Sequence, residues 1–94
     1  MKNLEYTATH EQAAELEGLA YWIAEQACTR ERYPDDTDTL EQADITIRFT
    51  FEQLDRMRVP FWVQKTVVGW AREWRNWKRE DIGTAMAREN IVLQ

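Results

Sequence analysis

The stretch from Pro60 to Arg79 constrains the fold of this chain more than any other. It holds four of the five tryptophans, and its apolar residues recur at spacings of four, three, four and three positions. This is the period of the buried side of an amphipathic helix. The residues on that side are Val63, Val67, Trp70, Trp74 and Trp77. A chain with such a helix needs a second element whose apolar side can cover it.

The composition is that of one small globular domain. The chain has 94 residues, of which 44% are hydrophobic and 31% charged. Its single cysteine, Cys28, excludes an intrachain disulfide and favours a reducing compartment. No stretch approaches the 18 apolar residues of a membrane span, and the first residues do not resemble a secretion signal. We therefore expect a soluble single domain over residues 1–94, in the cytoplasm and without membrane contact.

A first helix is predicted from the capping box Thr9-His-Glu-Gln12 to about Thr29–Arg32. Its buried side is formed by Leu16, Leu19, Ala20, Ile23 and Ala27. Trp22 falls on the charged side of this helix, so a second packing surface, on another helix or another chain, would explain it.

The segment from 39 to 57 fits two patterns. As a helix it places Leu40, Ala43, Ile47, Phe51 and Leu54 on one side. As a strand it alternates Ile45, Ile47, Phe49 and Phe51 with polar residues. The only segments that could pair with such a strand, residues 3–7 and 91–93, are weak candidates. We favour the helix, which leaves Ile45 and Phe49 on a second apolar patch.

Further along, Pro60 suits the first turn of the tryptophan-rich helix, and Gly69 inside that helix suggests close approach by another helix. The sequence Asp81-Ile-Gly-Thr84 predicts a break or a kink, followed by a last helical turn or two at 85–88. The resulting fold class is an all-α bundle of three main helices and a short C-terminal helix. The alternative is an α+β fold with one strand near 44–51.

The residues that usually carry catalysis are sparse. His10 and Cys28 are expected at opposite ends of one helix, about 27 Å apart at 1.5 Å per residue, too far to form a nucleophilic pair. Glu52-Gln-Leu-Asp55 matches half of the magnesium site of all-α nucleotide pyrophosphatases, but the second E-x-x-E is absent from the sequence. The Asp35–Asp38 cluster lacks the glycine and the closing glutamate of a calcium loop. We expect no enzymatic activity, no metal and no cofactor.

The charge is uneven along the chain, whose net charge is −5. Residues 1–57 carry five Lys and Arg against thirteen Asp and Glu, whereas residues 58–94 carry seven against four. The basic stripe on the tryptophan-rich helix consists of Lys65, Arg72, Arg75 and Arg79. Such a stripe between aromatic residues could follow a phosphate backbone, so nucleic-acid binding is the alternative function. The acidic character of the whole chain favours a protein partner instead.

Four apolar side chains fall outside the predicted core and are the candidates for partner binding, either to another protein or in a homodimer: Trp22, Ile45, Phe49 and Trp62. In size, acidity, tryptophan content and lack of catalytic groups, the chain resembles the small accessory proteins of bacteriophages and prophages. That resemblance implies a module, acting in the host cytoplasm, that binds and modulates or inhibits a host protein such as a nucleic-acid-processing or defence enzyme.

Overall fold

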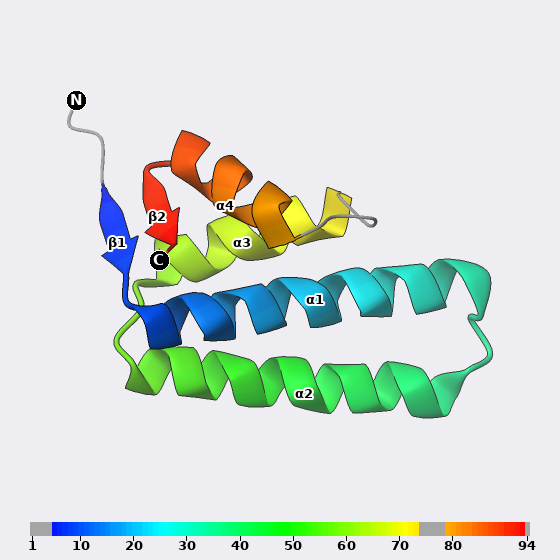
Figure 1. Cartoon of the computed structure of the whole chain (residues 1–94). Coiled ribbons are helices and arrows are strands. Elements are labelled where there is room, and N and C mark those ends of the chain that lie inside the picture. The colour runs from blue at the N-terminus through cyan, green and yellow to red at the C-terminus, as the bar shows by residue number, and fades with distance from the viewer. Residues whose placement is uncertain (1–4, 74–78, 94) are drawn as a thin grey trace.

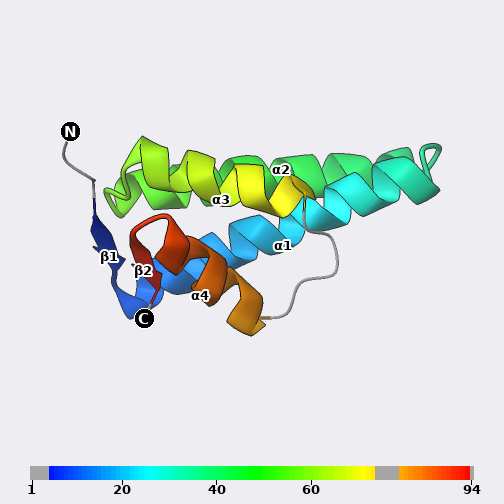
Figure 2. The ribbon, with the colours of Figure 1, turned by 90° about the horizontal axis from the view of Figure 1, so that it is seen from above.

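The computed structural model describes residues 5–73 and 79–93. Along the chain these form β1 (Tyr6–Ala8), α1 (His10–Arg32), α2 (Thr37–Arg56), α3 (Phe61–Glu73), α4 (Arg79–Arg88) and β2 (Ile91–Leu93). Helices α1 and α2 lie side by side and antiparallel, and α3 runs along α1 (Figures 1 and 2). The two strands lie at the end of the bundle where α1 begins (Figure 1). The predicted helical bundle is confirmed, with one small sheet added to it.

Side-chain caps determine where the two longest helices begin. The Thr9 hydroxyl accepts a hydrogen bond from the Gln12 amide (3.1 Å), and the Gln12 side chain accepts one from the Thr9 amide (2.9 Å). This reciprocal pair is the predicted capping box. Helix α2 begins after Asp36, whose carboxylate accepts a hydrogen bond from the Thr39 amide (3.2 Å). Both helices therefore form where the sequence predicts them, α2 beginning two residues earlier.

One hydrophobic core joins all four helices and both strands. Its largest fully buried apolar side chains are Leu16, Leu19, Leu54, Val63, Val67, Ile82, Met86 and Ile91. Ala8 of β1 is buried among them, whereas Ala27 of α1, predicted to be buried, is only partly covered. Because each element contributes to the same cluster, the described parts of the chain share one core.

The structure corrects one alternative and one prediction from the sequence. The alternative strand near 44–51 is wrong, because those residues lie within α2, where Ala43, Ile47 and Leu54 bury one side of the helix. The predicted break at 81–84 is also wrong, because these residues lie within α4. Ile82 and Met86, one turn apart, are 0% and 1% exposed, and their burial outweighs the helix cost of about 1 kcal/mol for Gly83.

Gly69 does not mark a close helix contact, contrary to the expectation from sequence. A methyl group added at this position would meet no atom of residues 5–73 and 79–93 within 4 Å, apart from its chain neighbours and the backbone of its own helix. Packing therefore gives no reason for glycine at this position.

The two short strands pair in parallel, with Tyr6 opposite Ile91 and Ala8 opposite Leu93. Asn90, between α4 and β2, has a φ of 64° and its carbonyl accepts the Tyr6 amide (2.9 Å). Asparagine tolerates this left-handed conformation better than most residues, so the chain can turn sharply into β2. The pairing joins the two ends of the described chain.

The turn between α2 and α3 is held by a Schellman motif around Arg58. The Val59 amide donates to the Leu54 carbonyl (3.0 Å), and the Arg58 amide donates to the Asp55 carbonyl (3.0 Å). Leu54 and Val59, which flank the turn, are both buried in the core. The position usually taken by glycine in this motif is occupied by Arg58, at a φ of 62°.

Replacing Arg58 by glycine is expected to raise the free energy of unfolding by about 0.5–1 kcal/mol. The left-handed conformation costs a residue with a Cβ atom more than it costs glycine. Chemical denaturation followed by circular dichroism measures the change. The matched control, Lys65→Gly at an exposed position in the interior of α3, should lose about 1 kcal/mol because it places glycine inside a regular helix. A loss of stability in both variants would contradict the account of the turn.

Candidate functional site

The outward side of α2 carries an exposed apolar pair. Ile45 and Phe49 are 51% and 57% exposed, and they lie one turn apart. At 100° per residue they point away from the side of α2 that buries Ile47 and Leu54. In Figure 1, α2 forms one edge of the bundle, and no described element lies beyond it. The predicted second apolar patch is therefore present on the surface.

The other two predicted binding residues, Trp22 and Trp62, lie in a different environment. Both indoles are partly buried and pack against the core cluster. The Trp22 ring also meets the Tyr21 ring edge to face, with centroids 5.4 Å apart and planes at 88°. Trp22 and Trp62 thus support the fold and also present part of their surface. Of the four predicted binding residues, Ile45 and Phe49 are the two that form a pair on the exposed side of one helix.

Phe61 is an exposed aromatic residue that is not among the predicted binding residues. It is the first residue of α3 and is 73% exposed. A helical wheel of α3 would have revealed it, because Phe61 falls opposite the buried Val63 and Val67. Since Phe61 lies on another helix, it provides a natural comparison for Phe49.

The structure describes only part of the predicted basic stripe. Lys65 and Arg72 are exposed and lie two turns apart on the same side of α3. Arg75 lies outside the described residues, as do Trp74, Trp77 and the Arg79 side chain. Trp70, predicted to be a core residue, is only partly buried and packs against the outside of the core cluster.

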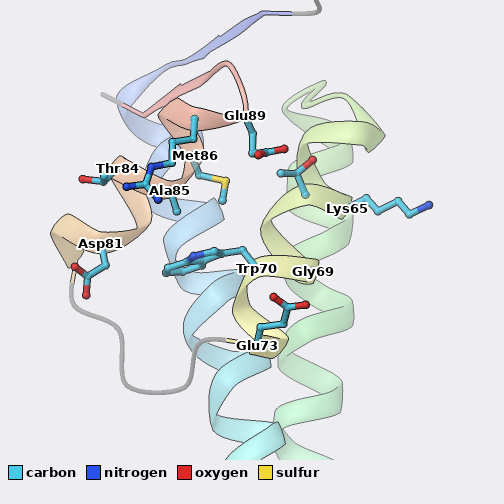
Figure 3. Close-up of a pocket in the computed structure, with 11 residues that line it drawn as sticks. Lys65, Gly69, Trp70, Glu73, Asp81, Thr84, Ala85, Met86 and Glu89 are labelled. Atoms are coloured by element: carbon cyan, nitrogen blue, oxygen red, sulfur yellow. The ribbon is translucent and has the colours of Figure 1, made fainter.

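Trp70 forms part of an open groove of about 690 Å³ between α3 and α4. Figure 3 shows its indole reaching from α3 towards α4 and Met86 reaching back from α4, whereas Lys65 points away. The lining includes the acidic residues Glu73, Asp81 and Glu89 and the basic residue Arg88. No group of three His, Cys, Asp or Glu side chains within residues 5–73 and 79–93 is placed to hold a metal ion.

The chain matches no protein-family model, no curated protein and no solved structure. None of the helices in the described segments combines the length and the apolar character needed to cross a membrane.

Proposed function

We propose that the protein is a non-catalytic module that binds another protein through the outward side of α2 and modulates that protein by binding. The observation that supports this proposal is the pair Ile45 and Phe49, more than half exposed on a helix whose other side is anchored in the core. Burying the remainder of each side chain would contribute on the order of 1 kcal/mol. A preformed helix with apolar residues at i and i+4 suits recognition by a groove on a partner.

The charges around this pair indicate what kind of partner fits. Glu41 and Glu52 are exposed on the same part of α2 as Ile45 and Phe49, and the exposed Arg48 nearby is paired with Asp44. A partner groove with an apolar floor and a basic rim would match this surface, because complementary charges orient an encounter. Nucleic-acid-processing enzymes carry basic surfaces for their substrates. A host enzyme of that class is therefore the partner we propose.

Capture from a bacterial lysate tests this proposal. The tagged protein is expected to retain a discrete partner, and Phe49→Glu is expected to lose most of it because a charge replaces the central apolar contact. The matched control is Phe61→Glu, the same substitution at an exposed aromatic residue on α3, which should retain the partner. Equal retention by both variants would count against the α2 surface.

Nucleic-acid binding through the basic stripe stays the second candidate, because Lys65 and Arg72 lie exposed on one side of α3. Binding of that kind weakens steeply with salt, since each neutralised phosphate releases counterions. Protein binding at the apolar pair would depend on salt much less.

A further inference from the structure

The exposed side of α2 is longer than the pair Ile45 and Phe49. Six residues recur at spacings of four, three, four, three and four, which is the heptad period of a coiled-coil contact. These six residues, which we call the α2 seam, are Asp38, Gln42, Ile45, Phe49, Glu52 and Arg56. All six are exposed, and they extend along almost the whole of α2, about 27 Å at 1.5 Å per residue.

When two copies of the α2 seam lie antiparallel, the residues that face each other are complementary. About a two-fold axis at position 47, an antiparallel second copy would place its Phe49 against Ile45 and its Arg56 against Asp38. Gln42 and Glu52 would form the remaining pair, which can hydrogen-bond. We infer that the α2 seam binds a second copy of this chain in an antiparallel homodimer.

The charges select the antiparallel direction. In a parallel dimer Asp38, Glu52 and Arg56 would each face the same residue of the other copy, and like charges across a helix contact repel. In the antiparallel dimer the end charges form two opposite-charge pairs, one at each end of the contact. The helix dipoles of the two copies of α2 also oppose one another in this arrangement.

The contact is expected to be weak and reversible. One exposed helical ridge with two apolar residues buries less than the roughly 1,200 Å² of a standard interface. Arg48 lies beside the two-fold axis, so the Arg48 residues of the two copies would come near each other. Each guanidinium is already paired with Asp44 of its own chain at 2.6 Å, which reduces their repulsion. Dissociation constants in the range of tens to hundreds of micromolar fit a contact of this size.

This inference rests on the proposed function, since both assign protein binding to the outward side of α2. The second copy and another partner protein would occupy the same ridge and exclude one another. Self-association would then reduce the fraction of chains able to bind that partner.

Sedimentation velocity of the purified protein, from about 10 μM to 1 mM, tests the dimer. The wild type is expected to move from monomer towards dimer with concentration, and Phe49→Glu to stay monomeric with unchanged helical circular dichroism. Asp38→Arg and Arg56→Asp should each weaken association by about fivefold, because two favourable end pairs become repulsive. The double variant D38R/R56D should recover it, since the opposite charges meet again only when the helices are antiparallel.

A wild type that stays monomeric at 1 mM would overturn the dimer, and so would a dimer that Phe49→Glu leaves intact. Failure of the double variant to recover, after both single variants weaken association, would overturn the antiparallel arrangement. The proposed function fails separately, in the lysate capture. If the purified chain is monomeric but Phe49→Glu loses a captured protein, the dimer is wrong and partner binding by α2 stands.

Discussion

Replacing Leu54 by alanine is expected to lower the free energy of unfolding by about 2–5 kcal/mol, through lost burial and the cavity left behind. Leu54 is fully buried in the shared core. Its carbonyl also accepts the Val59 amide in the turn between α2 and α3. The side chain thus packs at the point where the direction of the chain reverses. Urea denaturation followed by circular dichroism measures the loss.

The matched control is Ile45→Ala on the opposite side of the same helix. Because Ile45 is half exposed, its truncation should change stability by no more than about 0.5 kcal/mol when measured at low micromolar concentration. Similar losses at both positions would contradict the division of α2 into a core side and a binding side.

Gln64→Ala is expected to cost about 2–4 kcal/mol, although glutamine is a polar residue. Gln64 is 2% exposed, and its amide group donates to the Val59 carbonyl (2.9 Å) and to Asp55 Oδ1 (3.0 Å). Removing it leaves a carbonyl without that donor and a cavity at the junction of α2 and α3. Thermal and urea denaturation measure the effect.

Two further variants separate hydrogen bonding from packing at this site. Gln64→Leu restores most of the volume without a donor, so much of the loss should remain if the hydrogen bonds matter most. Gln42→Ala, at an exposed glutamine of α2, should stay within about 0.5 kcal/mol of the wild type. Full stability of Gln64→Leu would mean that Gln64 acts only by filling space.

The parts of the fold that depend on neighbouring residues could be predicted from the sequence. The capping box at Thr9 and Gln12 and the apolar period of α1 and α2 are local patterns, and the structure confirms the helices that they predict. The pairing of β1 with β2 joins residues at opposite ends of the chain, and three-residue strands leave little pattern to detect. The hydrogen bond from the Gln12 side chain to the Met57 carbonyl (3.0 Å) also joins distant parts of the chain, so no local pattern predicts it.

The candidate site was likewise predictable only where it depends on the pattern within one helix. The helical period alone placed Ile45 and Phe49 away from the buried side of α2. It could not place Trp22 and Trp62, because a helical wheel describes one helix and not the neighbours that partly cover these rings. It also missed the helix through Gly83, where burial of Ile82 and Met86 outweighs local propensity.

The most direct test of protein binding by α2 is capture from lysate with and without nuclease, comparing the wild type with Phe49→Glu. We expect a discrete protein that the wild type retains after nuclease treatment and that Phe49→Glu loses. Capture that disappears with nuclease, or that Phe49→Glu leaves unchanged, would contradict this account. The first of these results would favour nucleic-acid binding through Lys65 and Arg72.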